Sequence, residues 1–150
     1  MQPAPHNGYL AAHARLLFAS YRRLLGKPLL PEPDDAQALY LTPLVVVSHD
    51  TAADPIFNYA NLAAQRLFEM DWETFTRLPS RLSAGPVHRD ERRRLLERVS
   101  RDGCIDDYAG IRIARSGRQF RIESATVWNV ADAGGAYAGQ AACFSIWRDL

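Results

Sequence analysis

This 150-residue sequence has few cysteines, no long apolar segment and no excess of either charge. Its two cysteines, Cys104 and Cys143, are too few for the disulfide framework of a small secreted domain, so we expect two buried thiols. The longest apolar run, Leu44–Val47, is far shorter than the roughly 20 residues of a membrane helix. The 18 Lys and Arg residues against 17 Asp and Glu leave a net charge of +1, which gives no basis for direct nucleic-acid binding. These absences predict a cytoplasmic protein without membrane contact.

The length and the 47% share of hydrophobic residues predict one compact core. Near the N-terminus, residues 10–25 place apolar or small side chains at alternating spacings of four and three, which is typical of an amphipathic helix. Gly26 and Pro28 end this helix, and two further prolines predict an extended linker up to residue 36. We therefore divide the chain into residues 1–36 and a domain of residues 37–150.

One amphipathic helix cannot bury its apolar stripe alone. The stripe, formed by Leu10, Ala14, Leu17, Tyr21 and Leu24, must pack either on the sheet of its own chain or on a second copy. The second arrangement would make residues 1–36 a dimerisation element, so a homodimer through the N-terminal helix is one of two predicted outcomes.

The rest of the chain alternates between strand and helix patterns. Two short strands are predicted at 44–48 and 56–59, three helices at 62–70, 72–78 and 86–101, and three strands at 104–115, 118–130 and 136–147. Asn61 and Asp71 precede the first two helices as N-caps. This order predicts an α+β fold: a five-stranded antiparallel sheet with short helices on one face, plus the N-terminal amphipathic helix. In the strand 118–130, alternation predicts that every second side chain from Phe120 to Trp128 shares one face.

Several short segments carry a family resemblance. Residues 56–64, followed by Leu67-Phe68 and Asp71-Trp72-Glu73, resemble the opening of a PAS domain. A closer similarity, from about Leu16 to Trp147, is to the stand-alone bacterial form of the MEKHLA domain, a PAS-related family. The segments that carry it are Ser48-His49-Asp50, residues 54–61, residues 78–81, Val127-Trp128-Asn129 and residues 139–142.

The resemblance implies a PAS-like sensor of a small ligand, redox state or light, acting in signal transduction. Since the sequence shows no kinase or homeodomain, the output would be a change in self-association or a contact with a partner protein. The alternative is a protein–protein interaction or dimerisation module whose core is filled and binds no ligand.

No motif predicts an enzyme or a metal site. Ser48, His49 and Asp50 are consecutive in a strand and point to alternate faces, so they cannot form a hydrolase triad, and Asp50 is better explained by an Asx-turn. The four histidines are scattered and there is no CxxC pair. Residues 76–85 contain no cysteine, which excludes the cysteine adduct of photochemical flavin domains. Non-covalent flavin, haem ligated through His88, or another small ligand stays open.

Small side chains in the last strand indicate where a pocket could form. Gly139, Ala141 and Cys143 alternate with Ala138, Gln140 and Ala142, so a closely packed helix fills the space above them or a cavity remains. Gly139 is also predicted as a β-bulge or a point of close backbone approach in this strand. For the cavity, the aromatic walls would come from Tyr59, Trp72, Phe75 and Trp128, and the polar anchors from His49, Arg81 and Gln140.

The segment 86–101 is the most charged part of the sequence. Asp90 with Arg94, and Glu97 with Arg101, have the spacing of helical ion pairs, and Leu95, Leu96 and Val99 form an apolar side. We interpret this helix as covering the sheet with one side and presenting solvated charges on the other.

Overall fold

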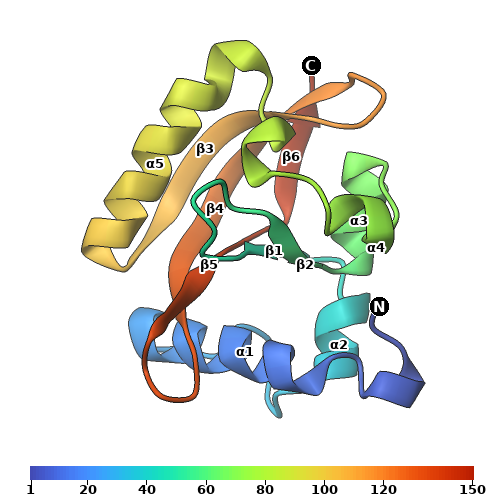
Figure 1. Ribbon diagram of the computed structural model, residues 1–150, viewed down its shortest axis with the longest axis vertical. Helices are drawn as coiled ribbons and strands as arrows, with labels where there is room; N and C mark the ends of the chain where they lie inside the picture. The colour runs from blue at the N-terminus through green and yellow to red at the C-terminus, as the bar shows by residue number, and fades with distance from the viewer.

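The computed structural model describes residues 1–150 and contains one antiparallel sheet (Figure 1). Its strands are β1 (Val45–His49), β2 (Phe57–Ala60), β3 (Cys104–Ile113), β4 (Gln119–Ala131), β5 (Tyr137–Phe144) and β6 (Ile146–Asp149). Their order is β2-β1-β5-β4-β3, and β6 pairs with β4 beyond the end of β5. The predicted α+β fold with its five-stranded antiparallel sheet is confirmed. The last predicted strand is interrupted at Ser145, which makes the sixth strand.

Five α-helices and three short 3-10 turns surround the sheet. The helices are α1 (Ala11–Leu25), α2 (Ala36–Leu41), α3 (Leu62–Phe68), α4 (Trp72–Phe75) and α5 (Arg89–Asp102), and the turns are η1 (Pro5–Asn7), η2 (Ser80–Ser83) and η3 (Pro86–His88). The predicted caps are confirmed, because the side chain of Asn61 accepts from Ala64 N at 3.1 Å and that of Asp71 from Thr74 N at 2.8 Å. Helix α2 was not predicted. None of the helices is both long enough and apolar enough to span a membrane.

Asn61 does more than cap α3. Its side chain is fully buried, accepts from Val46 N and donates to the carbonyl oxygens of Leu39 and Leu44. One amide therefore joins α2, β1 and α3, since each buried backbone group that it meets needs a partner.

The sheet has a separate core on each face. One core lies under α3, α4 and α5 and includes Phe57, Phe75, Leu95 and Phe120. The other lies under α1, on the opposite side, and includes Trp128 (Figure 1). The short helices between β2 and β3 are thus on one face as predicted, and the N-terminal helix covers the other.

Helix α1 buries its stripe on its own sheet, which is the first of the two predicted arrangements. Leu17 and Phe18 are buried, and the ring of Tyr21 meets Trp128 edge-on with centroids 5.0 Å apart. Ser20 Oγ accepts a 2.9 Å hydrogen bond from Ala131 N at the end of β4. Helix α1 is therefore part of the folded unit. A homodimer through this helix stays a prediction, and it would have to use the face of α1 that points away from the sheet.

The predicted alternation along β4 is wrong in its second half. Phe120 and Ile122 face the α5 side, whereas Trp128 faces α1. The change occurs at Ser124, which has a left-handed backbone with φ of +51° and has no partner in the register between β4 and its neighbours. One irregular residue shifts every later side chain to the opposite face.

Candidate functional site

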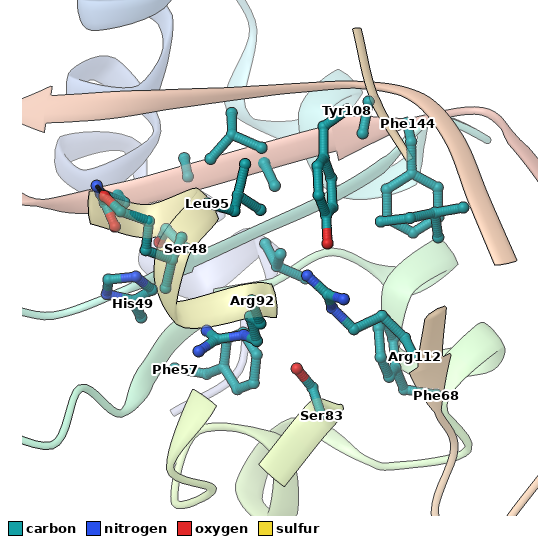
Figure 2. Close-up of a pocket in the computed structure, with 18 residues that line it drawn as sticks. Ser48, His49, Phe57, Phe68, Ser83, Arg92, Leu95, Tyr108, Arg112 and Phe144 are labelled. Atoms are coloured by element: carbon teal, nitrogen blue, oxygen red, sulfur yellow. Dashed lines mark hydrogen bonds between the residues drawn. The ribbon is translucent and has the colours of Figure 1, made fainter. Parts of the chain in front are cut away.

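A cavity of about 60 Å³ lies between α5 and the sheet (Figure 2). Of its 18 lining residues, 12 are hydrophobic, among them Phe57, Phe68, Leu95 and Phe144. Side chains of α5 reach it because positions 92, 95, 96 and 99 recur at helical spacing and form the buried side of the helix. Side chains of β3 reach it from Tyr108 and Arg112, four residues apart on the same face of the strand.

Two arginines line this cavity without an acidic partner. Arg92 is 9% exposed and Arg112 is 8% exposed, and neither takes part in an ion pair. Arg112 Nη1 donates to the carbonyl oxygen of Ile111 at 2.9 Å, and its guanidinium lies 5.4 Å from the centroid of the Tyr108 ring. The guanidinium of Arg92 has no hydrogen-bond partner in the chain. Figure 2 shows the guanidinium of Arg112 beside the Tyr108 hydroxyl and that of Arg92, which comes from α5, on the side of Phe57 and His49.

The two guanidinium groups affect each other electrostatically. Burial, and then the charge of Arg112, lower the pKa of Arg92 to about 9, so Arg92 remains charged at neutral pH. Asp54 acts on Arg92 in the opposite direction, but its carboxylate pairs with Arg81 at 3.1 Å on the surface. The cavity consequently holds two positive charges and no carboxylate among its lining residues.

Two more polar atoms of the lining are buried without a partner, the hydroxyl of Tyr108 and Nε2 of His49. The Tyr108 ring lies over Gly110, where any side chain would contact it. His49 Nδ1 lies 2.9 Å from the carbonyl oxygen of Asp50, so Nδ1 carries the hydrogen and Nε2 is an acceptor. Burial, followed by the charge of Arg92, lowers the pKa of His49, which keeps the ring neutral.

Comparison with known proteins identifies the family. The sequence profile of the MEKHLA domain matches residues 11–149. The chain belongs to the MEKHLA domain family. No curated protein matches the chain.

Solved structures resemble this MEKHLA domain in fold. The PAS domain of a protein from Colwellia psychrerythraea superposes with a TM-score of 0.64 and 15% identity, covering 77% of this chain and 92% of that one. An RNA-binding Light-Oxygen-Voltage receptor superposes with a TM-score of 0.58 and 17% identity, covering 72% of this chain and 30% of the receptor. The MEKHLA domain therefore has a PAS-like fold, as the sequence resemblance predicted.

Of the seven predicted pocket residues, the structure brings His49 and Gln140 to the cavity. Gln140 is already engaged, because its Nε2 lies 3.1 Å from each of three acceptors, the Leu96 carbonyl oxygen, Ser100 Oγ and Asn129 Oδ1. It ties α5 to the sheet. His49 retains a free acceptor.

The other five predicted residues lie elsewhere in the MEKHLA domain. Tyr59, Trp72 and Trp128 belong to the core under α1. Strand alternation directs Tyr59 there and the shift at Ser124 directs Trp128, while Trp72 of α4 packs edge-on against Tyr59 with ring centroids 5.7 Å apart. Phe75 packs edge-on against Phe57 and Phe68 in the α5-side core without lining the cavity. Arg81 is exposed and pairs with Asp54.

The sequence prediction missed Arg92, Tyr108 and Arg112. Arg92 stands three, four and seven residues before Leu95, Leu96 and Val99, which is the spacing of the buried side of the helix. That spacing was the available signal, and it was overlooked because arginine is rarely buried. Both predicted ion pairs of this helix are wrong as well, because Arg93 pairs with Asp90 and Arg101 with Asp102.

The residues of the rejected triad and the two cysteines make other contacts in the MEKHLA domain. His49 faces the cavity while Ser48 Oγ meets His13 Nε2 of α1 at 3.0 Å, and the Asp50 carboxylate accepts from Ala52 N and Ile56 N as an Asx-turn. Cys104 and Cys143 pack on the α1 side, and burial raises the pKa of the Cys143 thiol to about 12. No group of three His, Cys, Asp or Glu side chains converges.

Flavin and haem do not fit this cavity. Pockets for molecules of that size measure roughly 300–1,000 Å³, against about 60 Å³ here. His88 is half-buried at the start of α5 and does not line the cavity, so it offers no axial ligand there. The lining therefore suits a much smaller molecule.

Proposed function

We propose that this MEKHLA domain is a sensory, ligand-binding domain in signal transduction that takes a small molecule into the cavity between α5 and the sheet. The observation that carries the proposal is the polar lining, in which the Tyr108 hydroxyl and His49 Nε2 are buried without a partner. Beside them, the side chain of Arg92 is 9% exposed and has no carboxylate partner. Buried polar groups are nearly always paired in folded proteins, so two unpaired polar atoms in the lining of one cavity call for a partner from outside the chain. Family membership and the PAS-like fold support the same function.

Binding is proposed rather than catalysis. The cavity lining contains no carboxylate and no thiol, and His49, its one imidazole, has no acid or nucleophile beside it in hydrogen-bond contact. A general acid–base pair or an activated nucleophile would require such a contact.

A bound ligand would reach the outside through the elements that enclose it. Gln140 and Asn129 hold α5 on the sheet, with Asn129 Nδ2 donating to the Val99 carbonyl oxygen at 3.0 Å. A change in the position of α5 would thus be transmitted to β4 and β5, whose other face carries α1. We propose that the output is a change in self-association or in contact with a partner protein.

Self-association through α1 would use the face that does not touch the sheet. The exposed residues of that face are Ala12, Arg15, Ala19 and Arg23. A short edge strand offers a second surface, because Ile146 and Trp147 of β6 are 50% and 37% exposed. That edge favours the alternative function, a protein-interaction module without a ligand, in which the partner adds to the sheet.

Native mass spectrometry of gently purified protein, with a visible absorption spectrum, tests the proposal. We expect a colourless small molecule that is released when the protein is denatured. We also expect Ala19→Glu to lower the number of chains per assembly, and the control Ala53→Glu, in an exposed loop, to leave that number unchanged. Retained flavin or haem would contradict the volume argument. A chain that carries no ligand and gains no stability from any small molecule would favour the interaction module.

A further inference from the structure

The two cavity arginines differ from the other arginines that the chain fixes in place. Arg118 donates to the carboxylates of Glu69 and Asp149 and to the Leu67 carbonyl oxygen, and Arg22 pairs with Glu32 and Asp34. These paired arginines are partly exposed, so water screens them as well. Arg92 and Arg112 are buried, and together they have one hydrogen bond, to a backbone carbonyl oxygen of a neighbouring residue. The partly exposed arginines therefore have carboxylate partners, and the two buried arginines have none.

A buried guanidinium without a counter-charge is costly, and two in one cavity are more so. Water can occupy the cavity, since a site of about 60 Å³ exceeds the roughly 10–15 Å³ that one water molecule needs. Water hydrogen-bonds to a guanidinium but does not neutralise it. An anion would do both, because carboxylates and phosphates match the planar donor set of arginine.

The remaining lining selects among anions. Twelve of the 18 lining residues are hydrophobic, and Phe57, Phe68 and Phe144 lie around the polar groups (Figure 2). Inorganic phosphate would place charged oxygens against these rings. A small carboxylate has one charged end and an apolar remainder, which matches a cavity with two cationic groups and apolar walls. The Tyr108 hydroxyl, buried and unpaired, is a third donor beside Arg112.

We propose that the ligand of this cavity is a short-chain monocarboxylate, with its carboxylate bound by Arg92 and Arg112 and the Tyr108 hydroxyl, and its apolar tail against the phenylalanines. This inference rests on the proposed ligand-binding function and names its ligand class. It also explains why α5 carries an arginine on its apolar side, because the ligand completes the ion pair that the chain lacks.

The test measures thermal unfolding of the full chain with propionate, butyrate, propionamide and inorganic phosphate at equal ionic strength. We expect a concentration-dependent rise in the unfolding midpoint with the carboxylates only. Arg92→Met and Arg112→Met keep an unbranched apolar side chain and remove the guanidinium, and each should weaken carboxylate binding roughly 10- to 100-fold. Tyr108→Phe should weaken it less. Arg93→Met and Arg121→Met change an exposed and a half-buried arginine that do not line the cavity, and they serve as matched controls.

The unliganded variants give a second readout. If Arg92 serves a ligand, Arg92→Met without ligand should unfold at the same temperature as the wild type or higher, because an uncompensated buried charge has been replaced by an apolar side chain. A strong loss of stability would show a structural role and overturn the inference. Equal stabilisation by propionamide, or by phosphate alone, would overturn the carboxylate assignment and leave ligand binding intact. No stabilisation by any compound, together with no ligand in native spectra, would overturn both.

Discussion

At Gly139 the fold leaves no room for a side chain. The residue has a φ of +133°, and an added Cβ would contact the carbonyl oxygen of His49 in β1. The predicted close approach is therefore confirmed, and it occurs where β5 pairs with β1 beside the cavity. We expect Gly139→Ala to lower the free energy of unfolding by roughly 1–3 kcal/mol, from backbone strain and overpacking.

Urea unfolding followed by circular dichroism measures this effect, and Gly134→Ala is the matched control. Gly134 lies in the exposed β4–β5 turn, has no positive φ and would place its Cβ in ordinary contact with the Asp132 carboxylate. Equal midpoints for the two variants would show that β1 and β5 adjust freely at Gly139.

At the scale of single side chains, the sequence was informative where one rule decides the outcome. Asn61 and Asp71 were recognised as caps because only the next few residues determine a cap. The inward position of Tyr59 or Trp128 depends instead on the sheet as a whole, and a left-handed Ser124 reversed the expectation for Trp128. The predicted pocket included Tyr59 and Trp128 because the two-residue alternation of a strand separates its side chains into two faces but does not show which face borders a cavity.

At the scale of elements, α1 is the part whose role changed most between sequence and structure. Its amphipathic pattern predicts a helix but does not say what its apolar stripe packs against. The structure gives that partner as the face of β4 and β5 that α5 does not cover, where Trp128, Val130, Ala141 and Cys143 accept the helix. Helix α2 escaped prediction because nearby prolines indicated an extended chain, although Asp35 caps it through Gln37 N at 2.9 Å.

Truncation of the α1 stripe should therefore destabilise the monomer. Leu17 is 0% exposed and lies in the core under α1. We expect Leu17→Ala to lower the free energy of unfolding by roughly 2–5 kcal/mol, from lost apolar burial and the resulting cavity. Arg15→Ala, on the exposed side of the same helix, should change it by less than about 0.5 kcal/mol.

Chemical unfolding of both variants at several protein concentrations distinguishes a contact within the chain from one between chains. A loss for Leu17→Ala that does not depend on concentration is expected. A loss that appears only at high concentration would place the stripe in a dimer interface instead.

At the scale of the whole molecule, two histidines with a lowered pKa, the buried His49 and the half-buried His13, make the stability of the fold depend on pH. His13 lies in α1, with Nε2 3.0 Å from Ser48 Oγ and its ring stacked on Tyr59, and burial lowers its pKa. Burial, and then the charge of Arg92, lower the pKa of His49 on the other face, against the opposing effect of the Asp50 carbonyl oxygen and carboxylate. One histidine thus lies on each face of the sheet, so both cores oppose protonation.

The sign follows from proton binding in the two states. Both histidines keep the ordinary pKa of 6.5 in the unfolded chain and a lower one in the folded chain. Between these values the unfolded chain binds more protons, so the folded state loses stability as the pH falls below about 6.5. The carboxylates with lowered pKa, Glu69, Asp71 and Asp102, contribute only at more acidic pH.

We therefore expect the free energy of unfolding to decrease between about pH 7.5 and pH 5.5, measured by urea unfolding in buffers of equal ionic strength. His13→Gln and His49→Gln should each reduce the difference in the free energy of unfolding between the two pH values, because glutamine cannot take up the proton. This holds whatever each substitution does to the stability at the higher pH. His6→Gln changes an exposed histidine of η1 and should leave the difference unchanged. A double His13→Gln, His49→Gln variant with the full wild-type dependence would exclude both side chains as its source.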